Sequence, residues 1–198
     1  MISHPLTLQT ARVRLEPIDR RHIPDLVASC NDEALWEFTF SDNPFTSGAD
    51  IEWWWNDASD RAKYYTFAIV DKASGAVIGS TRYADLQPEH KKLEIGWTFI
   101  ARSHWRSHVN TECKYLLLSH AFDAMDLNRV QLKGEAVNTR SRAAMEGIGA
   151  TYEGTLRSFR IQPATGERRD TSFYSIVKAD WAVVKYRLEA RLRAVRTA

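Results

Sequence analysis

The stretch from Leu93 to Ala124 constrains the fold of this chain more than any other. It begins with an apolar segment typical of a β-strand, continues through a polar and basic loop, and ends in a leucine-rich segment with helical spacing. A helix that follows a strand and a loop exposes free backbone N–H groups in its first turn, where its dipole favours negative charge. The stretch therefore predicts an anion site on the loop. We expect a phosphate-bearing cofactor whose reactive end runs back along the strand.

Length, charge and cysteine content limit the class of protein. The 198 residues are enough for a single domain, residues 1–198, that buries its own core. A formal charge of +2 is too balanced to indicate a nucleic-acid-binding protein. Cys30 and Cys113 form no CxxC pair, so we expect reduced thiols in a cytoplasmic protein. The first residues do not resemble a signal peptide, and no apolar run is long enough to predict a transmembrane helix.

Hydrophobic periodicity and turn residues predict an α/β (α+β) domain, with a mixed sheet of about seven strands and helices on both faces. The predicted strands are residues 8–16, 64–71, 76–86, 92–100, 129–136, 151–161 and 168–177. The predicted helices are a segment capped by Asp19 that ends near Cys30, and residues 50–62, 110–125, 139–148 and 180–195. Short turns join the three strands from 64 to 100 into an antiparallel meander. A helix separates 92–100 from 129–136, which predicts that these two strands are parallel.

An acidic residue, Glu94, lies between Leu93 and Ile95 on the strand at 92–100. A carboxylate on an inner apolar strand is costly unless it is paired or has a function. Gly96 follows, and a glycine within a strand often marks a bulge that frees backbone N–H groups for a ligand. The alternative is that Glu94 faces solvent and that Gly96 only eases packing. The spacing is compatible with both interpretations.

The loop before the leucine-rich helix carries side chains that suit an anion. Arg102 and Arg106 could meet phosphates, and Ser107 and Thr111 could cap the helix. An ordinary capped helix with solvated arginines would explain the same residues.

A second polar segment, with Asn138 and Ser141, follows the strand at 129–136. Ligands of open α/β sheets gather beyond the carboxyl ends of parallel strands. This segment should therefore lie beside the first loop. The alternative is that Asn138 is only a helix N-cap and Ser141 a residue of the first helical turn.

Several short motifs are ordered and spaced as in one known family. They are Leu15-Glu-Pro, Leu93-Glu-Ile-Gly-Trp, Thr111-Glu-Cys-Lys, Leu127-Asn-Arg-Val, Asn138-Thr-Arg-Ser, Gly149-Ala-Thr-Tyr-Glu-Gly-Thr-Leu-Arg157, and Arg169-Asp-Thr-Ser-Phe-Tyr-Ser before Trp181. Together they span nearly the whole chain. On these motifs the chain resembles the GCN5-related N-acetyltransferase (GNAT) superfamily, in the branch of the bacterial ribosomal-protein N-terminal (Rim-type) acetyltransferases.

The resemblance implies a GNAT-like, mostly antiparallel sheet that splays between its two central parallel strands to admit the pantetheine arm of acetyl-CoA. It implies direct transfer of acetyl to a primary amine, with Glu94 as general base. Backbone N–H groups of Trp97 or Thr98 would hold the carbonyl oxygen, Ser141 would protonate the leaving thiolate, and Asn138 would hold the pantetheine amide. The residues implied to bind the cofactor are Trp97, Thr98, Phe99, Arg106, Ser107, His108, Val109, Asn110, Thr111, Asn138 and Ser141.

The loop departs from the family's pattern, which usually reads Gln/Arg-x-x-Gly-x-Gly/Ala. The aligned positions here are Trp105, His108 and Asn110, so His and Asn replace the two small residues. Glycines let a backbone approach phosphates closely. Without them, we expect a loop conformation that other residues tolerate, in which His108 or Asn110 contacts the cofactor directly.

Other residues that could carry chemistry have competing structural explanations. Trp53 and Trp54 could line the acceptor pocket together with Glu94, but core packing and surface stacking explain these rings as well. Cys113 has no clear base partner for a covalent acetyl-enzyme. The histidines show no metal-ligand spacing, so no metal is expected.

The sequence thus predicts an N-acetyltransferase that uses acetyl-CoA and acts on a peptide N-terminus or a small amine. We expect a monomer or homodimer, with no nucleic-acid or membrane partner. One alternative is an acetyltransferase for an amino-containing drug or metabolite. Another is a non-catalytic or differently specific acyl-CoA-binding protein, which the altered loop would suit. The presence of Glu94, Asn138 and Ser141 together argues against a non-catalytic protein.

Overall fold

The computed structural model describes residues 2, 4–39, 42–162 and 165–194. Within these residues, eight strands form one sheet in the order β1-β2-β3-β4-β5-β6-β8-β7. The strands are β1 (Leu8–Gln9), β2 (Val13–Pro17), β3 (Tyr64–Asp71), β4 (Val77–Gln87), β5 (Lys92–Ile100), β6 (Arg129–Glu135), β7 (Thr151–Ile161) and β8 (Arg168–Val177). Neighbouring strands are antiparallel, apart from the parallel pair β5 and β6. The mixed α/β fold, the meander and the parallel pair predicted from the sequence are confirmed.

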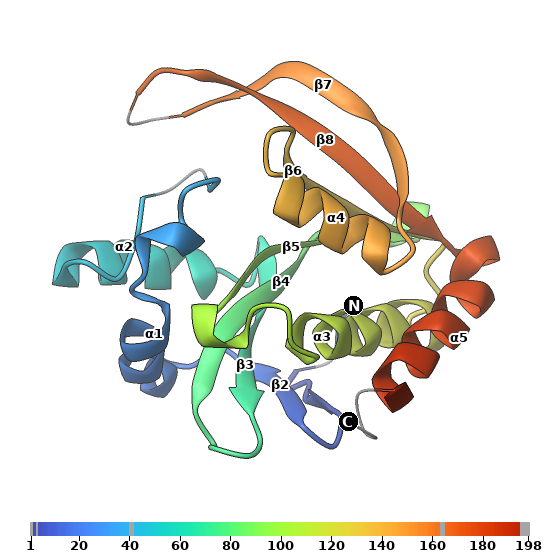
Figure 1. The fold of residues 1–198 in the computed structure, drawn as a ribbon, viewed down its shortest axis with the longest axis horizontal. Helices are drawn as coiled ribbons and strands as arrows, with labels where there is room; N and C mark the ends of the chain where they lie inside the picture. Colours follow the sequence, from blue (N-terminus) through green and yellow to red (C-terminus); the bar gives the residue numbers. More distant parts are fainter. Residues whose placement is uncertain (1, 3, 40–41, 163–164, 195–198) are drawn as a thin grey trace.

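Helices cover both faces of this sheet (Figure 1). One face carries α1 (Ile23–Cys30) and α2 (Gly48–Ala58), and the other carries α3 (Val109–Ser119), α4 (Thr139–Gly147) and α5 (Lys178–Ala194). Two successive residues of β4 point to opposite faces. Tyr83 donates a hydrogen bond to the carbonyl of Leu117 on α3 at 2.6 Å, whereas Arg82 pairs with Asp57 on α2 at 2.6 Å. We call these faces the α3 face and the α2 face.

The N-terminal strand differs from the prediction. The single strand expected over 8–16 is two short antiparallel strands, β1 and β2, in which Leu8 stands opposite Leu15. A turn joins them, because the Thr10 N–H donates to the Val13 carbonyl at 2.8 Å and the Val13 N–H donates to Thr10 Oγ1 at 3.0 Å. Leu8 is out of phase with Val13 and Leu15 in the alternation of a strand, which is the sequence sign of this break. The split brings the sheet from the predicted seven strands to eight.

Each helix has bounds that differ in part from those predicted. The segment capped by Asp19 is a 3₁₀ turn, Arg20–His22, followed by α1; α2 ends at Ala58 rather than residue 62, and α4 at Gly147 rather than residue 148. The helix expected over 50–62 is α2, which begins earlier because Ser47 caps it, with Ser47 Oγ accepting from the Asp50 N–H at 3.2 Å. The helix expected over 110–125 is α3 followed by one π-helical turn at His120–Ala124. The last helix begins at Lys178 rather than residue 180, and its predicted end at residue 195 lies outside the described residues.

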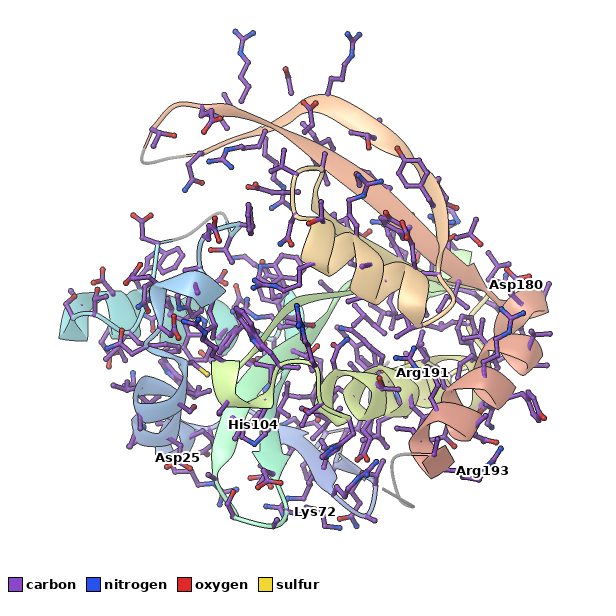
Figure 2. The ribbon with its side chains drawn as sticks, in the orientation of Figure 1. Asp25, Lys72, His104, Asp180, Arg191 and Arg193 are labelled. Atoms are coloured by element: carbon purple, nitrogen blue, oxygen red, sulfur yellow. The ribbon has the colours of Figure 1, made fainter. Side chains whose placement is uncertain are left out.

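The main core lies between the sheet and α3, where Leu15, Ile69, Tyr83 and Leu117 are at most 1% exposed. Trp181, Val184 and Leu188 of the last helix are buried against the domain. Arg193 is exposed (Figure 2), whereas Arg191 turns toward α4 and donates to the carbonyl of Gly147. Among the helices of the described residues, none has the length and apolar character needed to cross a membrane.

Candidate active site

The parallel strands β5 and β6 stay together for only a short distance. Their pairing covers Lys92 to Glu94 of β5, although β5 continues to Ile100 and β6 to Glu135. Beyond Glu94, the edge of β5 that faces β6 has no strand partner among the described residues. An unpaired strand edge presents backbone N–H and C=O groups that can bind an extended ligand. The splay that the family resemblance implies is therefore present, and it begins at Glu94.

A bulge interrupts β5 directly after this point. The register of β4 and β5 shifts between Gly96 and Phe99, where Trp97 and Thr98 stand opposite a single residue of β4. Trp97 has a φ of +49°, a left-handed conformation that is unusual for a bulky side chain. A bulge takes backbone N–H groups out of the ladder and leaves them available to a ligand. The bulge predicted beside Gly96 is confirmed.

Glu94 is buried at the start of the opening, with 2% of its surface exposed. Lys133 Nζ lies 2.7 Å from its Oε2 atom, and Gln131 Nε2 donates to the same oxygen at 3.1 Å. The alternative of a solvated Glu94 is therefore wrong. Lys133 was not among the residues predicted for the site. The available signal was the alternation of the strand at 129–136, which directs Gln131 and Lys133 to the same face.

The second carboxylate oxygen of Glu94 is not held in this way. No donor contacts Oε1 within the described part of the chain, and a Cβ atom added at Gly96 would come within 3.1 Å of it. Glycine at this position therefore keeps space beside Oε1. One oxygen of the carboxylate is anchored, and the other is available to take a proton.

Aromatic rings and two cations surround Glu94 on the α2 face. The rings of Tyr64 and Trp97 lie 4.9 Å apart between centroids. Lys133 Nζ and the Arg82 guanidinium each lie 5.8 Å from the centroid of Trp97. Burial, and then the nearby Asp57 carboxylate, raise the pKa of Tyr64. These residues form a wall of aromatic rings and paired charges beside the free oxygen of Glu94.

Ser141 and Asn138 lie on the other face. Asn138 caps α4, because its Oδ1 accepts from the Ser141 N–H at 2.9 Å. The hydroxyl of Ser141 lies over β6, 3.1 Å from a Cβ atom built at Gly134. Gly134 follows Lys133, so strand alternation places Ser141 on the α3 face, opposite Glu94. The opening between β5 and β6 is thus bordered by a carboxylate on one face and a hydroxyl on the other.

The loop before α3 tolerates the absence of glycines in a specific way. His108 has ordinary helical angles, φ −69° and ψ −20°, and Arg106 takes the left-handed conformation with φ +58°. The Val109 N–H donates to Ser107 Oγ at 3.3 Å. Among the described residues, the N–H groups of Asn110 and the next residue in the helix have no acceptor. His108 thus adopts a conformation that a non-glycine residue tolerates, as expected, while Arg106 takes the left-handed one. The helix keeps free donors for an anion, and the contact of His108 or Asn110 with the cofactor stays a prediction.

His108 places an unpaired ring nitrogen at this helix end. Its Nε2 atom is buried and has no hydrogen-bond partner. Burial, and then the nearby Arg12, lower the pKa of His108, which favours a neutral ring. Glu112, one turn into α3, accepts a hydrogen bond from Arg12 Nε at 2.6 Å. The positive charge of Arg12 reduces the repulsion that the Glu112 carboxylate would exert on a bound anion. The free N–H groups at the start of α3 suit an anionic group such as a pyrophosphate. The contact of His108 with such a group stays a prediction.

The remaining predicted residues of the site lie further from Glu94. Phe99 and Trp54 belong to an aromatic cluster with Phe45, in which the Trp54 and Phe99 centroids are 6.1 Å apart. Trp54 is 4% exposed, whereas Trp53 is 58% exposed. Core packing therefore accounts for Trp54. The pocket roles of Trp53 and Trp54 stay predictions.

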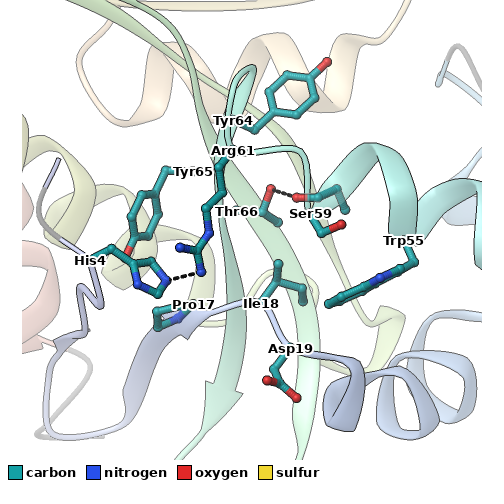
Figure 3. Close-up of a pocket in the computed structure, with 11 residues that line it drawn as sticks. His4, Pro17, Ile18, Asp19, Trp55, Ser59, Arg61, Tyr64, Tyr65 and Thr66 are labelled. Atoms are coloured by element: carbon teal, nitrogen blue, oxygen red, sulfur yellow. Dashed lines mark hydrogen bonds between the residues drawn. The ribbon is translucent and has the colours of Figure 1, made fainter. Parts of the chain in front are cut away.

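A cavity of about 230 Å³ lies between the end of α2 and the strands β2 and β3 (Figure 3). Its lining includes Trp55, Tyr64 and Tyr65, and Arg61 donates to His4 at 2.5 Å beside it. Tyr64 belongs both to this cavity and to the aromatic wall beside Glu94. The cavity itself lies at strands β2 and β3 rather than at the opening between β5 and β6.

Cys113 and the histidines show no sign of covalent or metal chemistry. Both cysteines are free and buried, and burial raises the pKa of Cys113 to about 12. A thiol in this state is a poor nucleophile at neutral pH. Within the described residues, no group of three or more His, Cys, Asp or Glu side chains could hold a metal ion.

Comparison with known proteins gives a consistent result. Residues 12–151 match the family model described as an acetyltransferase (GNAT) domain. YdaF of Bacillus subtilis (strain 168), whose name proposes a ribosomal N-acetyltransferase, is 29% identical over 175 residues, which cover 84% of this chain and 90% of YdaF. The crystal structure of a GCN5-related N-acetyltransferase from Brucella melitensis has a TM-score of 0.89 at 28% identity, over 95% of this chain and 86% of that chain.

A more distant structure shares the fold. The spermidine N-acetyltransferase from Vibrio cholerae, solved in complex with CoA and spermine, has a TM-score of 0.70 over 87% of this chain and 99% of that chain. At 18% identity, this likeness concerns the fold alone.

Proposed function

The chain belongs to the acetyltransferase (GNAT) family, and we propose that it transfers acetyl directly from acetyl-CoA to the primary amine of a peptide N-terminus or a small molecule. It is an acyltransferase, and a solved neighbour with this fold binds CoA. One observation carries the proposal most strongly. The opening between β5 and β6 begins at a buried carboxylate and lies beside the N-termini of two helices.

The proposed cofactor site lies on the α3 face. The pyrophosphate meets the free N–H groups at the start of α3 and the unpaired ring nitrogen of His108, with Arg106 on the same loop. The pantetheine arm follows the free edge of β5 towards Trp97. Asn138 contributes its side-chain amide nitrogen, because its oxygen already caps α4. Acetyl-CoA supplies the activated acyl group as a thioester.

The proposed acceptor site lies on the α2 face. An amine arrives as an ammonium ion at neutral pH and must lose a proton before it can attack. Glu94 Oε1, which has room beside Gly96, accepts that proton directly or through a water molecule. Lys133 and Gln131 hold the other oxygen and so fix the direction of the carboxylate.

The transfer then needs two further groups. The amine nitrogen forms a bond to the thioester carbon, and the carbonyl oxygen gains negative charge. A backbone N–H of Trp97 or Thr98, freed by the bulge, binds that oxygen. When the carbon–sulfur bond breaks, the sulfur leaves as a thiolate and takes a proton from the hydroxyl of Ser141. The nitrogen of the intermediate, which still carries one proton more than the amide, releases it to water, and Ser141 regains a proton from solvent. Ser141 lies on the cofactor's face of the sheet, as this role requires.

The acceptor class is proposed from the family branch. The likeness to the Rim-type acetyltransferases and the name of YdaF favour a peptide N-terminus. A small amine is the second candidate, because the rings of Tyr64 and Trp97 beside Glu94 offer apolar surface to its carbon chain.

A thiol-release assay with acetyl-CoA and an amine panel tests the proposal. The panel contains free amines, polyamines and short peptides with free N-termini. Release that depends on the amine, together with a mass increase on the peptide, supports acetylation of a peptide N-terminus. Release with free amines alone points to a metabolite or drug acetyltransferase. Tight CoA binding without release across the panel would show a non-catalytic acyl-CoA-binding protein.

A further inference from the structure

Lys114 is a buried cation that the mechanism so far does not use. It lies in the second turn of α3, with 6% of its surface exposed. Its Nζ donates to Thr98 Oγ1 at 2.8 Å, and the same oxygen lies 2.8 Å from Thr81 Oγ1. An ammonium group has three donors. Within the described residues, the other donors of Lys114 have no acceptor, and no carboxylate forms an ion pair with it.

Other buried ionic groups of this protein have partners. Arg82 pairs with Asp57 at 2.6 Å, and Glu112 pairs with Arg12. A buried cation without a counter-ion is costly, and an apolar side chain of similar size would fill the same space without that cost. Burial lowers the pKa of Lys114 to about 8, which leaves the ammonium form dominant at neutral pH. Packing alone therefore does not explain a lysine at this position.

The position of its acceptor gives Lys114 a place in the reaction. Thr98 is one of the two bulge residues of β5, and it lies on the stretch of β5 whose edge is free of β6. The hydroxyl of Thr98 also lies 3.4 Å from the carbonyl of Gly96, so it spans the bulge. Lys114 thus holds the side chain of a residue whose backbone N–H is a candidate donor to the thioester carbonyl.

We infer that Lys114 is a positioning residue for acetyl transfer, which fixes the bulge through Thr98 and places a positive charge behind the thioester carbonyl. The inference rests on the proposed function. As the amine attacks, the carbonyl oxygen gains negative charge. A fixed cation behind the N–H donors stabilises that charge without rearrangement at the moment of reaction. The free donors of Lys114 can also turn towards the bound acyl group.

The test measures how strongly the bound thioester is polarised, and it needs no acceptor amine. Acetyl-CoA labelled with ¹³C at its carbonyl is bound to the full-length protein, and the carbonyl stretch is read by isotope-edited infrared difference spectroscopy. The variant Lys114→Met removes the charge and keeps the length of the side chain. Lys185→Met makes the same charge change on α5, where Lys185 pairs with Asp123, and serves as the control. Dissociation constants for acetyl-CoA and melting temperatures are measured on each protein.

We expect the carbonyl stretch to shift to lower frequency on binding to the unaltered protein and to Lys185→Met. In Lys114→Met most of that shift should disappear, the dissociation constant should change by less than about threefold, and the melting temperature should stay equal or rise. With an active acceptor, kcat should fall by about tenfold or more, a part of the effect of losing an oxyanion donor. Thr98→Val should reproduce the loss of the shift, and Thr98→Ser should restore it.

Three results would overturn the inference. The first is a carbonyl shift that Lys114→Met retains in full. The second is a large fall in melting temperature with an unchanged shift, which would make Lys114 a structural residue. The third is a shift that Thr98→Val leaves unaltered. Failure of the unaltered protein to bind acetyl-CoA at all would instead contradict the proposed function, and the inference with it.

Discussion

The two faces of the opening between β5 and β6 differ in whether their polar groups already have partners. On the α2 face the charges nearest the carboxylate already have partners, with Glu94 held by Lys133 and Arg82 by Asp57. On the α3 face some polar atoms of the described residues have no partner, namely the N–H groups in the first turn of α3 and His108 Nε2. Backbone N–H groups without an acceptor can bind an anionic ligand without breaking an existing contact. A ligand that binds to paired charges must compete with the partners that they already have. The difference indicates that the α3 face is built for binding and the α2 face for selection and proton transfer.

The largest effect is expected from removing the base on the α2 face. Glu94→Gln keeps the shape of the side chain and removes its ability to accept a proton. We predict a fall in kcat of about 10²–10³-fold, with a dissociation constant for CoA that changes by less than about threefold. Steady-state kinetics and calorimetry provide the two values. Glu89→Gln, on the exposed turn between β4 and β5, is the matched control. Turnover within about threefold of the unaltered protein would remove Glu94 from the mechanism.

The pairing of Glu94 and Lys133 should be visible in stability. Lys133→Met leaves a buried carboxylate without its counter-ion, and we predict a loss of about 2–3 kcal/mol in the free energy of unfolding. The double variant Glu94→Gln with Lys133→Met removes both charges and should recover most of that loss. Urea denaturation measures all three proteins. If the single and double variants are equally unstable, the ion pair is not the source of the effect.

A smaller effect is expected on the α3 face, because several donors share the anion there. His108→Ala should weaken CoA binding by about tenfold, equal to the loss of one hydrogen bond to a charged group. The kcat at saturating acetyl-CoA should be nearly unchanged. His90→Ala, an exposed histidine on the turn between β4 and β5, is the control for calorimetry. A fall in kcat at saturation would place His108 in the chemistry rather than in binding.

The smallest effect concerns pH. Burial lowers the pKa of His108 from its usual 6.5, so the unfolded chain binds a proton more readily than the folded one. Stability is therefore retained above pH 6.5 and is lost as the pH falls through that value towards the lower folded pKa. His108→Asn should reduce the difference in stability between about pH 7.5 and 5.5 without abolishing it, because burial also lowers the pKa of His120. If His108→Asn keeps the full difference in stability between these two pH values, His108 does not contribute to the pH dependence.

The architecture followed from the sequence because it depends on local signals. A long helix between two apolar strands dictates a parallel pair, and a glycine beside Glu94 indicated the bulge. The break between β1 and β2 was also visible, since Leu8 is out of phase with the strand that follows. It was missed because a turn at Thr10 carries no glycine or proline.

The electrostatics of the site did not follow from the sequence. The contact of Glu94 with Lys133 joins residues 39 positions apart, and it depends on the register of two strands. Lys114 was visible as a lysine within a leucine-rich helix, but the acceptor it finds on β5 depends on how α3 packs. The structure shows where the site residues lie. Their roles in the reaction stay predictions.

The most direct test is amide hydrogen exchange of β5 with and without acetyl-CoA. The cofactor is proposed to lie along the part of β5 that is not paired with β6. Acetyl-CoA should therefore slow exchange over Ile95–Ile100 and in the first turn of α3, and should leave Lys92–Glu94, already paired with β6, unchanged. Protection confined to α2, or the absence of any change over Ile95–Ile100 at saturating acetyl-CoA, would contradict this placement.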